Sequence, residues 1–300
     1  MSQIILREKP ELKRPILIVA FAGWNDAGHA ATIAVQQLNA AWSAAEFATI
    51  DPDLFYDFNT SRPWVRLEES GEQRLTWPGV SFHAHRDEKG GLDAILVVGS
   101  EPSFRWPSFS REIVEFAREL DVSMVVTLGA YFGQVSHQDT VPISGWAWPK
   151  ALHERLQEVE ITPIGYEGPT GILSALSNAF AEAQIPVASL WAAVPNYLGP
   201  TPNPKAALAL VRRLDRAFGL GVSADDLVKA ADQFERQVNH AVQQAKLMPG
   251  AAPYQQSEGD ATRLAETKDD IGPGSTPTEL PSAEEAIEFA EELLRNNRPG

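Results

Sequence analysis

The sequence predicts an α/β protein, a three-layer α/β/α sandwich with a mostly parallel central sheet and additional helices toward the C-terminal end. Three observations support this. Short apolar runs, several of which end in glycine, alternate with helical stretches, which is typical of a sheet covered by helices. The 300 residues are 44% hydrophobic, enough to bury a sizeable core. Two helices with clear start signals follow the last apolar run.

The first element is an apolar strand from Ile16 to Phe21 that runs into a loop bounded by Gly23 and Gly28. A helix follows, with Asn25 or Asp26 as its expected cap. The glycine spacing is that of a phosphate-binding P-loop, which needs Lys and then Ser or Thr directly after the second glycine. The residues there are His29 and Ala30, so we do not expect nucleotide hydrolysis by that mechanism.

The middle of the chain continues the alternation of strands and helices. A Ser70–Gly71 pair joins two alternating segments and predicts a hairpin. Two continuous apolar runs predict buried central strands. The expected strands are 47–50, 64–68, 72–77, 80–85, 94–99, 123–129, 161–165 and 187–194, and the expected helices are 108–121 and one from about Thr170.

Two later helices are well marked. The first has Pro204 at its start and glycines at its end, as helices commonly do. The second begins with Ser223 and Asp226 in capping-box spacing and carries an apolar seam at alternating steps of four and three residues. That seam either packs on its own domain or forms an interface between subunits, for which the candidates are Leu227, Phe234 and Val238.

The composition changes near Met248, which divides the chain into three parts. Residues 1–248 form the α/β domain, residues 249–282 a linker or extended arm, and residues 283–297 an acidic amphipathic helix. Residues 249–300 hold 11 acidic and 4 basic side chains, so this segment carries −7 of the formal net charge of −15.

The composition also bears on partners and location. A net charge of −15 argues against nucleic-acid binding. The absence of cysteine excludes disulfides and thiolate ligands and fits a reducing cytoplasm. With no apolar run near the roughly 18 residues of a membrane span, we expect a cytoplasmic protein without membrane partners. His83 and His85 lie two residues apart without an evident third ligand, so we expect neither a metal site nor a cofactor.

Polar residues cluster where the predicted strands end, which is where open α/β sheets bind ligands. The catalytic candidates are Asp26, Glu101, His137 and Glu167, and the ligand-binding candidates are Trp24, Asn25, Trp106, Thr170 and Gly171. Two close carboxylates could perform acid–base chemistry if burial separated their pKa values. The same residues could instead cap helices, shape turns and fill the core.

Several motifs together resemble one family. "FAGWNDAG", "VVGSEPSFRW", "TLGAYFGQVSH", "GPTGIL" and "SLWAAVPNYLGPTPNPKAALALVRRL" resemble the PAC2 (proteasome assembly chaperone 2-like) family in its actinobacterial branch. The resemblance covers about residues 14–250. It implies a fold related to nucleoside phosphorylases and some hydrolases, homo-oligomers that include trimers, and relatives that act as chaperones in building the proteasome core.

The sequence departs from the family pattern in two places. Family members often continue V-P-H-T-R-P after the "LGA" strand, whereas this chain keeps His137 but has Asp139 at the arginine position. Some proteasome-binding chaperones end in a hydrophobic-Tyr-any tail, whereas this sequence ends in Pro299 and Gly300, so we do not expect that mode of binding.

These observations leave three hypotheses. The first is an oligomeric assembly or interaction factor with protein clients and no enzymatic activity. The second is a phosphorylase- or hydrolase-like enzyme, or a small-molecule binding protein, with a cleft at the strand ends. It loses support because the usual hydrolase, metalloprotease and dinucleotide motifs are missing. The third is an acidic regulatory protein whose 250–300 segment recruits a basic partner.

Overall fold

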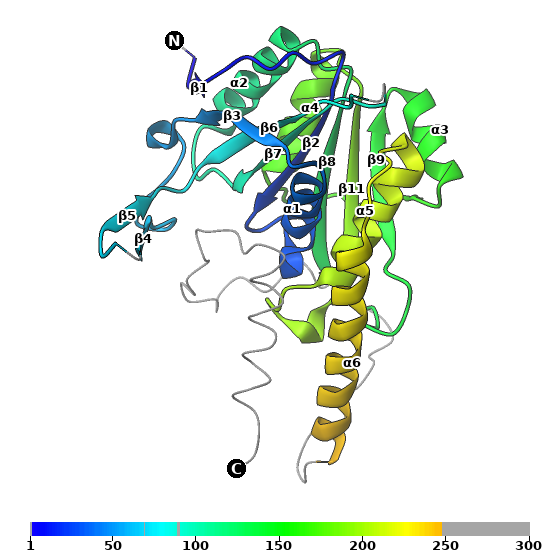
Figure 1. Cartoon of the computed structure of the whole chain (residues 1–300). Coiled ribbons are helices and arrows are strands. Elements are labelled where there is room, and N and C mark those ends of the chain that lie inside the picture. The colour runs from blue at the N-terminus through cyan, green and yellow to red at the C-terminus, as the bar shows by residue number, and fades with distance from the viewer. Residues whose placement is uncertain (1, 69, 89–90, 248–300) are drawn as a thin grey trace.

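The computed structural model describes residues 2–68, 70–88 and 91–247 and has three layers, with one sheet between two layers of helices (Figure 1). The predicted arm at 249–282 and helix at 283–297 lie outside the described residues. The large sheet has the strand order β1 (Ile4–Leu6), β3 (Ala45–Ile50), β6 (Val80–His85), β7 (Ala94–Ser100), β2 (Ile16–Ala22), β8 (Met124–Gly133), β11 (Val187–Pro195), β9 (Ile143–Trp148) and β10 (Thr162–Pro163).

The three-layer α/β/α prediction is confirmed, but the sheet is mixed, with parallel pairs at its centre and between the edge strands β9 and β10. Strands β7, β2, β8 and β11 are parallel neighbours. The strands β1, β3 and β6 run antiparallel to their neighbours on one side, and β9 runs antiparallel to β11 on the other. The difference has a physical reason: the described residues between β6 and β7 form no helix, and this short connection turns the chain back directly instead of making a parallel crossover.

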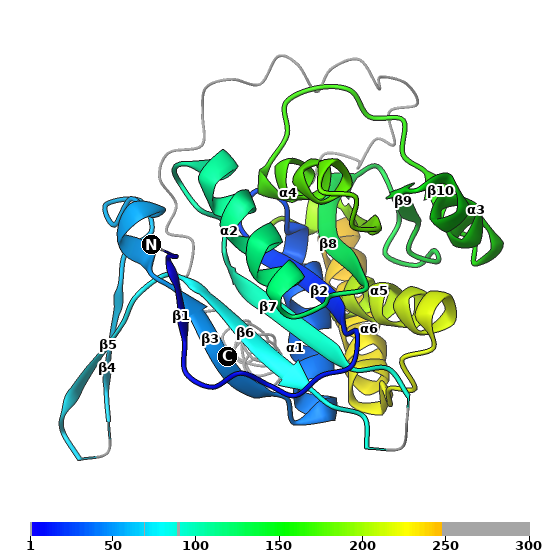
Figure 2. The same ribbon diagram turned by 90° about the horizontal axis from the view of Figure 1, so that it is seen from above.

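The helices cover both faces of the sheet (Figure 2). Helices α1 (Ala30–Trp42), α5 (Pro204–Phe218) and α6 (Asp225–Leu247) belong to one apolar core, and α2 (Trp106–Glu119) and α4 (Ile172–Glu182) to the other. The short helix α3 (Lys150–Glu158) packs near β9 at the edge of the sheet. The parallel strands contribute side chains to both cores, because successive residues of a strand point to opposite faces of the sheet.

The caps of the later helices agree only in part with expectation. Asn203 accepts a hydrogen bond from the Ala206 N–H at 2.9 Å, and α5 ends at Gly219 with φ 68°, as predicted. Helix α6 begins at Asp225, and the Ser223 hydroxyl bonds the Asp225 side chain at 3.0 Å, so the predicted capping box with Asp226 does not form.

The seam of α6 lies against its own chain. Leu227, Phe234 and Val238 are all buried within the single protomer, and Leu227 belongs to the same core as α1 and α5. Packing on the protein's own domain therefore accounts for the burial of the predicted interface residues without a second subunit.

A separate two-stranded sheet stands away from the three layers. Strands β4 (Trp64–Leu67) and β5 (Gln73–Thr76) form the predicted hairpin, which projects from the body in both views (Figures 1 and 2). Its large apolar side chains are exposed. A hairpin of this size is marginally stable alone in water.

Candidate functional site

A cavity of about 440 Å³ lies at the carboxyl ends of β2 and β7, where the sequence predicts a ligand site. Of the predicted residues, Glu101 and Trp106 line this cavity. The remaining walls come from the start of α1, the 57–61 loop and the turn after β7, and include Gly23, His29, Asp57, Ser61, Ser100 and Phe104. The other predicted catalytic residues, Asp26, His137 and Glu167, do not line it.

The Glu101 carboxylate joins three parts of the chain. It accepts hydrogen bonds from the Asn25 side-chain amide at 2.7 Å, the Ile172 N–H at 2.9 Å and the Trp24 N–H at 3.3 Å. The Ile172 N–H is at the first turn of α4, where helix geometry favours a negative charge. We call this arrangement of Glu101, Asn25 and Ile172 the Glu101 clasp; it binds the ends of β2 and β7 to the start of α4.

The clasp explains why a glycine precedes α4. A Cβ atom added at Gly171 would lie 2.3 Å from the Asn25 amide nitrogen, so only glycine allows Asn25 to occupy this position. Asn25 is completely buried, and its backbone carbonyl also accepts a hydrogen bond from the Ala130 N–H at 2.8 Å. Asn25 and Gly171 were predicted as ligand-binding residues. In the structure Asn25 links chain segments by hydrogen bonds, and Gly171 leaves the space that Asn25 occupies. Trp24 beside them is exposed.

Asp26 is buried at the start of the first helix and does not line the cavity. Its carboxylate accepts hydrogen bonds from the Ala31 N–H at 2.7 Å and the Thr32 hydroxyl at 2.5 Å. A single 3-10 turn, η1 (Ala27–His29), separates it from α1, so Asp26 caps the helix as predicted, from a position one turn earlier. Burial raises the pKa of Asp26 to about 7, although the hydrogen bonds from Thr32 and Ala31 oppose the shift.

His29 is a cavity residue that the sequence reasoning did not select. It precedes α1 with φ 51°, a left-handed conformation that is uncommon for residues other than glycine. Its Nδ1 atom is buried and has no hydrogen-bond partner in the described structure. Burial lowers the pKa of His29, which favours the neutral imidazole. The sequence feature that could have identified His29 as a site residue is its position directly after Gly28, where a P-loop has its lysine.

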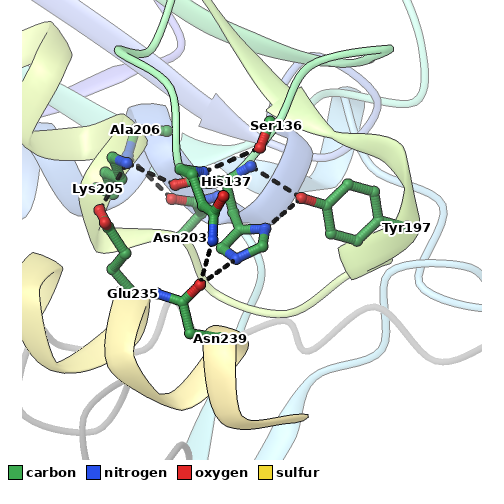
Figure 3. Close-up of polar contacts among 9 residues, drawn as sticks. Ser136, His137, Tyr197, Asn203, Lys205, Ala206, Glu235 and Asn239 are labelled. Atoms are coloured by element: carbon green, nitrogen blue, oxygen red, sulfur yellow. Dashed lines mark hydrogen bonds and ion pairs between the residues drawn. The ribbon is translucent and has the colours of Figure 1, made fainter. Parts of the chain in front are cut away.

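His137 is held by residues far from it in the sequence (Figure 3). Its Nδ1 is 2.5 Å from the Tyr197 hydroxyl and its Nε2 is 3.1 Å from Asn239 Oδ1 on α6. The Tyr197 hydroxyl also accepts a hydrogen bond from the His137 N–H at 2.8 Å. Both ring nitrogens are therefore engaged, and the imidazole ties the loop after β8 to η3 (Asn196–Leu198) and to α6.

Lys205 reinforces this connection. Its ammonium group donates a hydrogen bond to the His137 carbonyl at 2.5 Å and pairs with Glu235 on α6 at 2.7 Å (Figure 3). The Lys205 side chain is mostly buried, so the ion pair is less screened than a surface pair. The arrangement fixes α6 against the loop between β8 and β9 and gives His137 a positioning role.

The remaining predicted residues do not come together. Glu167 and Thr170 are exposed in the loop before α4, and the Thr170 hydroxyl donates a hydrogen bond to Ser174 Oγ. Trp106 begins α2 and donates its indole N–H to the Pro102 carbonyl at 2.6 Å. The four catalytic candidates therefore occupy four different surroundings and do not share one cleft.

The described residues, which exclude 1, 69, 89–90 and 248–300, contain neither a metal-binding cluster nor a membrane-spanning helix. No group of three His, Asp or Glu side chains there could hold a metal ion. His83 lies 2.9 Å from Ser81 Oγ, and His85 stacks on Trp42. Within the same residues, every helix is too short or too polar to span a membrane.

The fold is a three-layer α/β/α sandwich in which polar residues at the strand ends mainly join structural elements. The model of the PAC2 family matches residues 20–242, and the chain belongs to the PAC2 family, which confirms the sequence resemblance. No curated protein matches the sequence.

Solved structures with this fold come from bacteria and archaea. A proteasome-assembly chaperone homologue from Mycobacterium tuberculosis is 37% identical with a TM-score of 0.69, covering 76% of this chain and 95% of its own. A PAC2 family protein from Streptomyces avermitilis is 40% identical with a TM-score of 0.71, covering 75% and 95%. These two are actinobacterial members, as expected. PbaB of Pyrococcus furiosus, an archaeal proteasome activator, has 18% identity, a TM-score of 0.64 and coverage of 80% and 98%, a likeness of fold alone.

Proposed function

We propose that this protein acts in the cytoplasm as a homo-oligomeric assembly factor that binds protein subunits, in the manner of a chaperone. The observation that carries the proposal is the separation of the catalytic candidates. Glu101 and His137 are engaged in hydrogen bonds between distant segments, and Asp26 caps a buried helix end. Membership of the PAC2 family supports the same conclusion, because relatives with this fold are named for proteasome assembly or activation.

Self-association is the first part of this proposal to test. We expect light scattering of the full chain at micromolar concentration to give a mass that is a whole multiple, two or more, of the protomer mass. A trimer is the multiple that the family resemblance suggests. A single protomer mass over the whole micromolar range would contradict the proposal.

Binding of a small polar molecule is a second candidate function, and the cavity favours it. His29 contributes a buried nitrogen without a partner, and Ser61, Ser100 and Ser103 line the same cavity. We expect a ligand from a panel of phosphate, nucleosides and nucleotides to raise the unfolding midpoint of the full chain. At 100 times its dissociation constant a ligand adds about 2.7 kcal/mol, or roughly 5–10 °C here.

The matched variant for this test is His29→Asn, because asparagine tolerates the left-handed conformation and removes the imidazole. A midpoint shift that the variant abolishes supports ligand binding in the cavity. A panel without any shift, or a shift that persists in His29→Asn, counts against this second function.

A further inference from the structure

The cavity at the carboxyl ends of β2 and β7 contains negative charge that the chain does not balance. Glu101 and Asp57 both line it. The ion pairs between described residues include neither carboxylate. Of the described residues, no lysine or arginine lines the cavity, and Arg105, between the lining residues Phe104 and Trp106, is not one of them.

Both carboxylates are held in place by neutral donors. Asp57 accepts hydrogen bonds from the Asn59 N–H at 2.9 Å, the Asn59 side-chain amide at 3.2 Å and the Thr60 hydroxyl at 3.1 Å. Glu101 likewise accepts three hydrogen bonds, all from N–H groups. An ionised carboxylate has about four acceptor positions, so each retains capacity for a further donor. The hydrogen bond from the Asn59 N–H lowers the pKa of Asp57, although desolvation opposes the shift, which keeps this carboxylate ionised at neutral pH.

Aromatic rings belong to the same lining. Phe104 and Trp106 both line the cavity, and Phe104 is half-exposed. The Trp106 indole N–H donates to the Pro102 carbonyl at 2.6 Å, which fixes the ring at the start of α2. A cation within about 6 Å of such a ring is attracted to its face, most strongly with tryptophan. Carboxylates beside aromatic rings are therefore suited to an organic cation.

His29 adds a neutral group and no positive charge. Burial lowers the pKa of His29, so its imidazole is uncharged at neutral pH. Its buried Nδ1 atom has no partner in the described structure, and it can accept a hydrogen bond when the proton is on Nε2. A cation in the cavity therefore meets no like charge from His29.

We propose that the cavity binds an alkyl chain that ends in a guanidinium or ammonium group, the chemistry shared by arginine and lysine side chains and by free amines. This inference rests on the second candidate function, ligand binding in the cavity, and gives the class of its ligand. The volume of about 440 Å³ suits a small group, since ligand pockets span roughly 300–1,000 Å³. A side chain of a bound protein subunit would connect this site to the proposed assembly function.

Titration calorimetry of the full chain with butylguanidinium tests the requirement for charge. Its neutral counterpart is butylurea, which keeps the shape and lacks the charge. We expect butylguanidinium to bind at least about tenfold more tightly than butylurea, because charge-assisted hydrogen bonds are roughly twice as strong as neutral ones. A capped tripeptide with a central arginine, compared with the same peptide containing citrulline, then distinguishes a protein side chain from a free compound as the source of the cation.

Asp57→Asn is the matched variant, because asparagine keeps an acceptor oxygen for the turn and loses the charge. Asp51→Asn is its control: Asp51 accepts a similar hydrogen bond from the Asp53 N–H at 3.1 Å and does not line the cavity. The affinity for butylguanidinium should fall about tenfold in Asp57→Asn and stay unchanged in Asp51→Asn. Glu101→Gln, which also keeps an acceptor oxygen, serves if Asp57→Asn does not fold.

The results separate this inference from the second candidate function. If phosphate, a nucleoside or a nucleotide gives a midpoint shift that His29→Asn abolishes and butylguanidinium does not bind, the ligand class is wrong and ligand binding stands. If no compound in the combined panel binds, both fail. Equal binding of butylguanidinium and butylurea, or equal affinity of the wild type and Asp57→Asn for butylguanidinium, also overturns the proposal.

Discussion

Replacing Glu101 with alanine should lower the free energy of unfolding by about 3 kcal/mol, because the Glu101 clasp loses its only carboxylate. The change leaves the Asn25 amide and the Ile172 N–H without their acceptor, and each buried group that loses its partner costs roughly 1–3 kcal/mol. In a domain of this size that corresponds to a fall of about 6–12 °C in the unfolding midpoint. Thermal unfolding followed by circular dichroism measures it.

The matched control is Glu182→Ala, since Glu182 accepts one exposed hydrogen bond from Asn178 on the same helix. Its midpoint should change by no more than a few degrees. A second test of the clasp is Gly171→Ala, which forces Asn25 away, with Gly165→Ala as its control because no other atom lies within 4 Å of a Cβ added there. Equal midpoints for Glu101→Ala and Glu182→Ala would show that the clasp adds little to stability.

The stability of the wild type should depend on the ionisation of Asp26. Burial raises its pKa from 3.8 to about 7 in the folded state, so between these values the folded protein binds more protons than the unfolded one. Its contribution to stability is therefore complete below pH 4 and is lost as the pH rises through 7. The total change is up to about 4 kcal/mol, at about 1.4 kcal/mol for each pKa unit.

Asp26→Asn removes this titration and keeps an oxygen that can accept from the Ala31 N–H. We expect denaturant unfolding to show the wild type losing stability relative to Asp26→Asn between pH 4 and pH 8. Burial lowers the pKa values of His29 and His83, which gives the opposite pH trend, but both variants share it. The exposed Asp232→Asn serves as control. A difference between wild type and Asp26→Asn that stays constant with pH would mean that Asp26 remains ionised when folded.

The sequence predicted those elements whose signals are local. The apolar strands β2, β7 and β8, the Ser70–Gly71 hairpin and the Pro204 helix all appear where expected. Strand β9 and helix α3 were missed. In β9, Trp146 and Trp148 alternate with smaller residues, and its pairing with β11 comes from the tertiary fold. Local sequence patterns also could not predict whether the strands at the sheet edges run parallel or antiparallel to their neighbours. That direction depends on which connections between strands lack helices.

The sequence predicted where the candidate site lies, but not what its side chains contact. The rule that ligands bind at strand ends led to Glu101 and Trp106, and both line the cavity. What the side chains do there depends on partners distant in sequence: Ile172 for Glu101, and Tyr197 and Asn239 for His137. Hydrogen bonds over such separations leave no periodic signal. His29 was missed because its role follows from a backbone conformation and a buried nitrogen.

The measurement that tests the assembly-factor proposal most directly is the effect of the full chain on unassembled proteasome α and β subunits, the clients that its relatives suggest. Native electrophoresis and peptidase activity would follow the assembled particle over time, with an unrelated protein of similar acidity as the control. We expect a co-migrating complex of the chain with free subunits and faster formation of the active particle. An unchanged rate without any complex would contradict the role in assembly.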